Sequence, residues 1–493
     1  MSTTTSPPTS QHDTYTSPLA ARNASPEMCK IWSPRHKFTT WRKIWLAVAQ
    51  AQQACGLDIT DQQINEMKAA LEVTDEDMDN AANYERDLRH DVMAHVHAFG
   101  DRCPSAKGII HLGCTSQDVV CNGDRKAQLE AYILLAGKVR RTVLALGVFA
   151  NKWKASPTLG FTHYQPAQPM TVGRRAAGWA YELGLCLDRF EEQLFHFQAR
   201  GFRGATGTQA SFHSLFEGNE QTIDRFERHA LQDLFDEPLD FDLTGQTYPR
   251  VVDTFILADL ASIASVLHKI ATDIRLLSNR KEIDEPFGKN QIGSSAMPYK
   301  RNPMKCERIC GLTRFVMNLV GNAYDTAATQ WLERTLDDSS NRRLSLPEAF
   351  LALDGALDLM HTVASGLVVN EAMVRKNLML ELPFMATENI LMEAVKAGGD
   401  RQDLHEKIRV HSQAAGHRVK QEGLDNDLID RLKADPDFAP IHHMLTEDQI
   451  LNPMNFIGRS VEQTERFLKE VVEPLKDRYK DELDSLGSAD RGV

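Results

Sequence analysis

Long intervals without proline are the feature that most constrains how this chain of 493 residues can fold. Proline is absent from residues 170–237, 250–285 and 304–346. Within 256–277 the apolar residues follow alternating steps of four and three, which lines one face of a helix for several turns. The same spacing recurs at 129–150 and 179–197. Because such a repeat lets helices pack at shallow angles over long distances, it predicts a central bundle of unusually long helices.

The two ends of the chain show shorter helical patterns, broken by polar turns. No strand-like alternation extends far, and no repeat typical of solenoids is present. We therefore expect an all-α subunit of three domains: an N-terminal helical domain at 1–115, a long-helix bundle at 116–369 and a C-terminal helical domain at 370–493. Residues 1–14 are rich in Ser, Thr and Pro and are expected to form a disordered tail.

Helices of this length have more apolar surface than the bundle of one subunit easily covers. The pattern therefore predicts a homo-oligomer that is built through the central helices. A monomeric bundle is the alternative.

Composition limits the classes of function. A hydrophobic content of 42% and a charged content of 25% are typical of a soluble globular protein. A net charge of -12 argues against general nucleic-acid binding, although a local cluster of Arg and Lys can still bind a small anion. We expect no membrane span, because no apolar run approaches the roughly 18–20 residues that a bilayer requires. The N-terminus also lacks the pattern of a secretory signal.

The eight cysteines show no CxxC pair and no regular spacing, which favours reduced thiols in the cytoplasm. Cys306 and Cys310 lie one helical turn apart and could ligate a metal ion, but ordinary helix packing is the favoured interpretation.

Residues 293–303 (GSSAMPYKRNP) interrupt the helical pattern most clearly. One glycine and two prolines prevent a regular element, and Lys300 and Arg301 add two positive charges. Long irregular stretches inside compact proteins are commonly functional lids. From composition alone, a solvated connector remains an equal alternative.

His163 lies in a second irregular segment, residues 160–168 (GFTHYQPAQ), between two long helices. Neighbouring Thr162 and Gln165 can fix the tautomer and orientation of the imidazole. Such a histidine suits a general acid or base, although a lone histidine is more often structural.

Two further polar segments, 89–97 and 111–118, contain several histidines. A metal site is disfavoured, because the chain has no HExxH motif and His95 and His97 would fall on opposite sides of a helix. The hydroxyls of Thr115 and Ser116 could instead bind a carboxylate near a helix start.

Residues 333–343 (ERTLDDSSNRR) combine three arginines with serines and an asparagine. Guanidinium groups match the geometry of phosphate and carboxylate, so this cluster suits an anionic substrate. An exposed turn whose acids pair with its own arginines is the alternative.

Together these segments resemble the aspartase/fumarase superfamily, whose GSS…MP…K.NP pattern matches the loop at 293–303. Within that superfamily the chain is most similar to the adenylosuccinate lyase family in its animal form, from about Tyr15 to Lys480. Further matching segments are SPLAARNASPEM, RHDVMAHVHAFG, GFTHYQPAQ, ATGTQASF, TGQTYPR, ERTLDDSSNRR, ELPFMATENI and VKAGGDRQDLHEKIRV.

The resemblance implies a homotetramer with a shared central bundle and active sites assembled from three subunits. It also implies β-elimination of fumarate without a cofactor or metal, from adenylosuccinate to give AMP and from the succinylcarboxamide ribotide SAICAR to give AICAR. Proton removal next to a carboxylate builds a doubly charged intermediate that placed cations and donors stabilise.

The resemblance further assigns roles to individual residues. Ser294 is the base that takes the Cβ proton, and His163 is the acid that protonates the leaving nitrogen. A serine can act as a base only if its alkoxide is stabilised in a closed loop, for instance by Lys300 and backbone N–H groups. The implied substrate-binding residues are Arg22, Asn23, His90, Asp91, His111, Thr115, Ser116, Thr162, Gln246, Lys300, Asn302, Arg334, Leu336, Ser339 and Arg343.

Asn23 departs from the family pattern, which has tyrosine after the arginine. The missing hydroxyl puts phosphate affinity in question rather than the chemistry. Two other functions compete with this interpretation: a superfamily cousin acting on argininosuccinate or malate, and a non-catalytic helical scaffold. The arginine cluster disfavours the first, and the presence of both Ser294 and His163 disfavours the second.

Overall fold

The computed structural model describes residues 13–235 and 239–481, so residues 1–12 of the expected tail lie outside the described part. Contacts group the chain into two compact units. Unit 1 contains Met1–Val139, Cys186–His268 and Cys310–Asp358, and unit 2 contains Arg140–Leu185, Lys269–Ile309 and Leu359–Val493. The three domains expected from the sequence stay a prediction.

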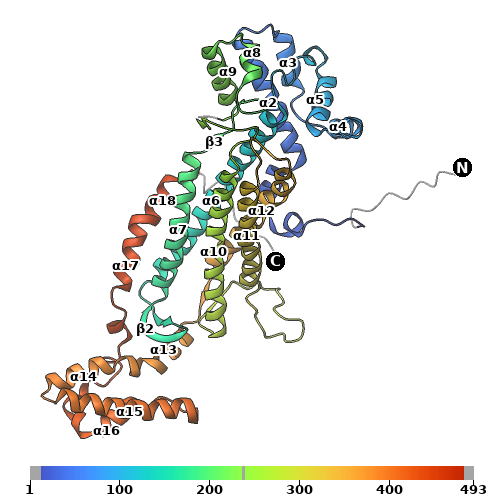
Figure 1. Ribbon diagram of the computed structural model, residues 1–493. Coiled ribbons are helices and arrows are strands. Elements are labelled where there is room, and N and C mark those ends of the chain that lie inside the picture. The colour runs from blue at the N-terminus through green and yellow to red at the C-terminus, as the bar shows by residue number, and fades with distance from the viewer. Residues whose placement is uncertain (1–12, 236–238, 482–493) are drawn as a thin grey trace. The chain divides into compact units, whose positions relative to one another are not determined.

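Five long helices dominate the chain and contribute residues to both units (Figure 1). They are α6 (Ser116–Lys152), α7 (Val172–Phe195), α10 (Val251–Asn279), α11 (Met304–Ala328) and α12 (Asp337–Gly366). The predicted all-α class with long central helices is therefore confirmed. The face of α10 is the clearest case, since its apolar residues from Ile256 to Leu277 at steps of four and three are all buried. Ile133 of α6, by contrast, is 52% exposed.

Helix α10 also corrects one expectation. By length and composition alone it could cross a membrane, although the sequence was expected to contain no such segment. Half of its most apolar stretch is buried in the protein, as in the core helix of a soluble bundle. Polar contacts tie it to its neighbours: Trp179 of α7 donates to Asp273 at 2.7 Å, and His268 lies 3.1 Å from Thr313 of α11.

Short helices around α2 form the main core of unit 1. They are α1 (Pro26–Ile31), α2 (Pro34–Ala54), α3 (Asp61–Ala69), α4 (Asp75–Leu88), α5 (Asp91–Arg102), α8 (Ala210–Leu215) and α9 (Glu220–Gln232), with a π-helical turn η2 (Leu19–Asn23) and a 3-10 turn η3 (Pro104–Ala106). Large aromatic side chains fill this core, including Trp41, Trp45, Phe99 and Phe226. Strands β3 (Gln198–Ala199) and β4 (Leu239–Asp240) pair in parallel beside it.

Helix α2 begins where its sequence requires. The hydroxyl of Ser33 accepts the N–H of His36, and Pro34 occupies the first helical position, where its missing N–H costs nothing. This cap sets the start of the turn that carries Lys37.

Unit 2 contains a β-hairpin and the C-terminal helices. The hairpin strands are β1 (Pro157–Thr162) and β2 (Gln165–Thr171), and β5 (Ile283–Asp284) pairs with β6 (Val368–Val369). The helices are α13 (Glu371–Met385), α14 (Thr387–Lys396), α15 (Arg401–Glu422), α16 (Leu428–Ala434), η4 (Pro436–Met444), η5 (Pro453–Phe456), α17 (Ser460–Phe467), η6 (Leu468–Val472) and α18 (Glu473–Arg478). A separate apolar core that includes Leu382, Ile390 and Phe438 holds the later helices together.

Candidate active site

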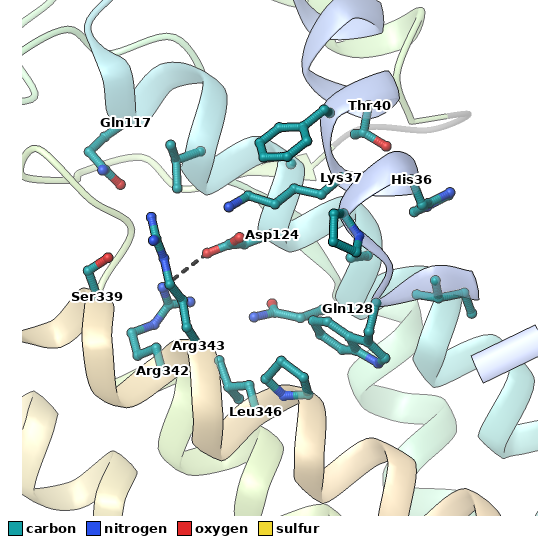
Figure 2. Close-up of a pocket in the computed structure, with 18 of the residues that line it drawn as sticks. His36, Lys37, Thr40, Gln117, Asp124, Gln128, Ser339, Arg342, Arg343 and Leu346 are labelled. Atoms are coloured by element: carbon teal, nitrogen blue, oxygen red, sulfur yellow. Dashed lines mark hydrogen bonds and ion pairs between the residues drawn. The ribbon is translucent and has the colours of Figure 1, made fainter. Parts of the chain in front are cut away.

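A cavity of about 260 Å³ lies within unit 1, between the start of α2, the first turns of α6 and the first half of α12 (Figure 2). Three residues that the resemblance assigns to substrate binding line it: Arg334, Ser339 and Arg343. Lys37, Asp124 and Arg250 also line it and were not singled out from the sequence. Gln117 and Arg342 line it as well and belong to the polar segments 111–118 and 333–343. Their side chains reach one place only through tertiary packing.

Buried carboxylates hold the arginines of this cavity in place. Asp338 accepts from Arg250 at 2.7 Å and from Arg334 at 3.2 Å. Arg334 also donates to Gln246 at 3.1 Å, so the structure brings together two residues that the resemblance assigns to the substrate. Since Asp338 is 1% exposed, its two arginines are fixed by charge-assisted bonds rather than left to sample solvent. As in the alternative for 333–343, an acid of the segment pairs with one of its own arginines, but this acid, Asp338, is buried and also binds Arg250.

Arg342, one turn further along α12, is anchored by a second set of carboxylates. Its guanidinium donates to Asp253 at 2.6 Å and to Asp124 at 3.0 Å, and also to the hydroxyl of Tyr248. Burial raises the pKa of Tyr248, so its hydroxyl stays protonated and donates to Asp253 at 2.6 Å. This network fixes the helix turn from which Arg343 extends.

A second group of predicted residues meets beside Arg343. Arg343 donates to Asp91 at 3.0 Å, and His90 Nε2 lies 3.3 Å from the hydroxyl of Ser116. Burial opposes the charge of Asp91, but the N–H of Val92 and the guanidinium of Arg343 outweigh it and lower the pKa of this carboxyl. His90 is the N-cap of α5, where Nδ1 accepts the N–H of Met93 at 3.3 Å, which leaves Nε2 to carry the proton.

Thr115 and His111 are positioned by the surrounding core. The N–H of Thr115 donates to Asp118 at 2.7 Å, and Asp118 is itself paired with the buried Arg200. Trp45 donates to His111 Nδ1 at 3.0 Å, and burial lowers the pKa of His111. His111 is therefore a neutral imidazole that presents Nε2–H.

Nine of the twelve predicted residues of unit 1 do not line the cavity, among them Arg22, Asn23 and Leu336. Arg22 is exposed on η2, and Leu336 is 71% exposed. The side chain of Asn23 donates to the carbonyl of Pro18 at 2.8 Å, so it caps its own turn instead of facing the cavity. The carbonyl of Asn23 packs so closely on Gly355 that a Cβ there would lie 2.6 Å from it.

His163 occupies the turn of the β-hairpin in unit 2. His163 and Tyr164 have φ values of 52° and 55°, and two positive φ values in a two-residue turn are typical of type I′. Non-glycine residues in this conformation are strained, and such strain is frequent at functional sites. The side chains of Thr162 and His163 are exposed at the tip.

The loop that carries Ser294 is closed at its base. The side chain of Asn302 donates to the carbonyl of Gly293 at 2.8 Å, and a Cβ at Gly293 would lie 2.1 Å from the carbonyl of Lys300. Glycine is thus required for this close approach. The backbone N–H groups of Ala296 and Met297 point at Ser294 Oγ from 3.4 and 3.1 Å.

Helix α11 anchors the far end of the same loop. Glu285 accepts the N–H groups of Lys305 at 3.0 Å and Cys306 at 2.9 Å, which satisfies two free donors at the helix start. Lys305 Nζ in turn donates to the carbonyl of Pro286 at 3.1 Å. Lys300 is exposed on the loop. Neither Glu285 nor Lys305 was singled out from the sequence.

The predicted residues thus fall into two sets. Those suited to phosphate and ribose lie in unit 1, and the proposed acid and base, with Thr162, Lys300 and Asn302, lie in unit 2. Within residues 13–235 and 239–481, no group of three or more His, Cys, Asp or Glu is arranged to hold a metal ion.

Comparisons with known proteins agree with this fold. A family described as Lyase matches residues 20–318, and one described as Adenylosuccinate lyase C-terminus matches residues 383–467. The 3-carboxy-cis,cis-muconate lactonizing enzyme of Pseudomonas putida shares the fold, with a TM-score of 0.81, 24% identity and coverage of 93% of this chain and 99% of that one. Fold and site therefore define a lyase.

Curated relatives show to which family of lyases the chain belongs. Adenylosuccinate lyase of Saccharomyces cerevisiae is 48% identical, over 94% of this chain and 95% of that protein. Adenylosuccinate lyase of Schistosoma mansoni is 44% identical, over 96% of this chain and 98% of that protein. This chain belongs to the adenylosuccinate lyase family.

Proposed function

We propose that this protein eliminates fumarate from adenylosuccinate to give AMP, and from SAICAR to give AICAR, in purine nucleotide synthesis. Family membership over nearly the whole chain supports the reaction type. In each case a base takes the Cβ proton of the succinyl group, the C–N bond breaks as the C=C bond of fumarate forms, and an acid protonates the departing nitrogen.

One observation carries the choice of a nucleotide as substrate. The cavity of unit 1 is lined by Arg334, Ser339 and Arg343, which together offer guanidinium and hydroxyl donors to a dianion. Argininosuccinate and malate carry no phosphate, so neither would supply this cavity with a phosphate dianion.

Ser294 is proposed as the base and His163 as the acid. The two N–H groups directed at Ser294 Oγ would stabilise an alkoxide, much as an oxyanion hole does. His163 would protonate the departing nitrogen from the exposed tip of the hairpin. Lys300, Asn302, Thr115 and Ser116 are proposed to hold the succinyl carboxylates.

A homotetramer in which each active site is built from three subunits is proposed. This assembly would bring the predicted residues of unit 1 and those of unit 2 into one active site. Exposed apolar side chains along the long helices support assembly, among them Tyr181, Leu185, Phe255 and Tyr324 at 52%, 53%, 45% and 57% exposure. Faces of this kind are commonly covered by another copy of the chain. Light scattering should give a mass near four times 55.4 kDa; a monomer mass at micromolar concentration would contradict the assembly.

Small nucleotides are proposed as the only binding partners, and neither nucleic acid nor a membrane is expected to bind. The enzyme is also proposed to act without a cofactor. Elimination by proton transfer needs no redox or carbonyl chemistry, which supports the last point. A cytoplasmic location is proposed, because all eight cysteines are free, as expected of a reducing compartment.

Absorbance on mixing the purified protein with adenylosuccinate, argininosuccinate or malate tests the function. Turnover of adenylosuccinate alone is expected. Turnover only of argininosuccinate or malate would overturn the proposal.

A further inference from the structure

The cavity beside α2 contains a cation, Lys37, that was not predicted from the sequence as a site residue. Lys37 extends into it from the first turn of α2, toward the side where Asp124 and Arg343 lie (Figure 2). Its ammonium lies 4.8 Å from the ring centroid of Trp41 and 5.2 Å from that of Phe38, and these aromatic faces fix its position.

The carboxylates of Asp124 and Asp91, which lie near Lys37, are engaged elsewhere. Asp124 pairs with Arg342 at 3.0 Å, and Asp91 pairs with Arg343 at 3.0 Å. Among the described residues, Lys37 makes no ion pair and no side-chain hydrogen bond. A half-buried ammonium without a counter-ion is costly, which indicates that an anion is its partner in the working protein.

The excess of positive charge in the cavity lining also indicates an anionic ligand. Of the described residues that line it, five are cationic and one is a carboxylate; the cations are Lys37, Arg250, Arg334, Arg342 and Arg343, and the carboxylate is Asp124. Burial and, after it, the guanidinium of Arg343 lower the pKa of Lys37, while the nearby carboxylates oppose this shift. Two buried guanidinium nitrogens of this lining, Arg250 Nη1 and Arg334 Nε, also have no acceptor among the described residues.

We propose that Lys37 binds the 5′-phosphate of the nucleotide, opposite Arg343 and Ser339, and so helps to select phosphorylated substrates. This inference rests on the proposed function. The dianion would replace the missing counter-ion of Lys37 and accept from the guanidinium groups across the cavity. Its contribution belongs to substrate binding, so it should act on KM and not on the proton transfers.

Kinetics of Lys37→Gln test the role, with Lys43→Gln as the matched control, because Lys43 is an exposed lysine of the same helix outside the cavity. We expect K37Q to raise KM for adenylosuccinate about tenfold or more, with kcat changed less than about threefold. K43Q should leave both unchanged, and Lys37→Arg should restore KM to within about threefold, because it keeps the charge. An unchanged KM in K37Q would overturn the inference and leave the proposed function standing.

Chemical labelling of the wild-type protein decides the question even if K37Q does not fold or the protein does not turn over adenylosuccinate. Acetylation of Lys37 by acetic anhydride is followed by peptide mass spectrometry with AMP, inorganic phosphate or adenosine present. AMP should slow acetylation of Lys37 about fivefold or more, at a concentration well above its Kd, and leave Lys43 unaffected. If inorganic phosphate also protects Lys37, the phosphate group alone is sufficient for binding. If only AMP protects it, the phosphate must be attached to the nucleoside in order to bind. No protection by AMP, or equal protection by adenosine, would overturn the inference.

Discussion

Ser294 shows how one side chain depends on its immediate backbone. Its oxygen faces two N–H groups, yet no side-chain base touches it among the described residues, so the backbone must stabilise the alkoxide. His163 is equally dependent on conformation, since it occupies the hairpin turn at a φ of 52° with its side chain exposed.

We expect Ser294→Ala and His163→Asn each to lower kcat by about 10²–10⁴-fold, the range of positioned acid–base catalysis, with little change in KM. Asparagine is chosen at 163 because it tolerates positive φ, which alanine does not. Steady-state kinetics on adenylosuccinate measure the effect. Ser295→Ala, at an exposed neighbouring serine, is the control, and a loss as large as that of S294A would contradict the assignment.

His95 makes stability depend on pH. It stacks on Phe38 with ring centroids 3.6 Å apart, and burial followed by the charge of Arg42 lowers its pKa to about 4. The unfolded chain therefore takes up a proton near pH 6.5, whereas the folded protein does so only near pH 4. Stability is full above pH 6.5 and falls as the pH drops through this window.

Relative to His95→Phe, the wild-type protein should lose about 2–3 kcal/mol of unfolding free energy between pH 7 and pH 4.5. Phenylalanine keeps the stack and removes the titration. Urea unfolding at a fixed protein concentration measures the difference. A difference between the two proteins that stays constant across this range would contradict a buried, neutral His95.

Helices could be predicted from the sequence where the same spacing of apolar residues repeats over many turns. In α10 every position of the apolar face is buried, because a helix of 29 residues repeats the signal many times. The hairpin of β1 and β2 escaped prediction, since its strands are short and contain Pro157, Pro166 and Pro169, residues that disfavour ordinary strands. Its turn also lacks glycine and asparagine, the usual residues at positive φ.

The loop at 293–303 depends on the start of α11, so Glu285→Gln should loosen it. An amide can accept only one of the two N–H groups that the carboxylate now binds, and the other would be left buried and unpaired. We expect a loss of about 1–3 kcal/mol in stability, a lower kcat and faster proteolytic cleavage within the loop. Limited proteolysis followed by mass spectrometry measures this. Glu307→Gln, at an exposed acid in the first turn of α11, should behave as wild type, and equal cleavage rates in E285Q and wild type would contradict the anchor.

At the scale of the molecule, the site could be predicted only in part. Short motifs pointed to Ser294, His163 and the arginines near 334–343, because each sits in a distinctive local pattern. Lys37 and Asp124 could not be predicted from motifs, because each lies within a helix of ordinary sequence. They line one cavity only because α2, α6 and α12 pack together. Pairs distant in sequence, such as Arg250 with Asp338, require the fold in the same way.

The division of the predicted residues between two units leads to a test of the assembled enzyme. If Ser294 and His163 of one active site come from different subunits, mixed tetramers of S294A and H163N will contain sites in which both residues are wild type. With random mixing in equal amounts, each position is wild type in half of the cases, so about a quarter of the wild-type activity should return. The inactive variants are unfolded together, refolded and assayed, with each variant refolded alone as the control. Assembly confirmed by light scattering without any regained activity would contradict shared sites, because sites built within one chain would always lack one of the two residues.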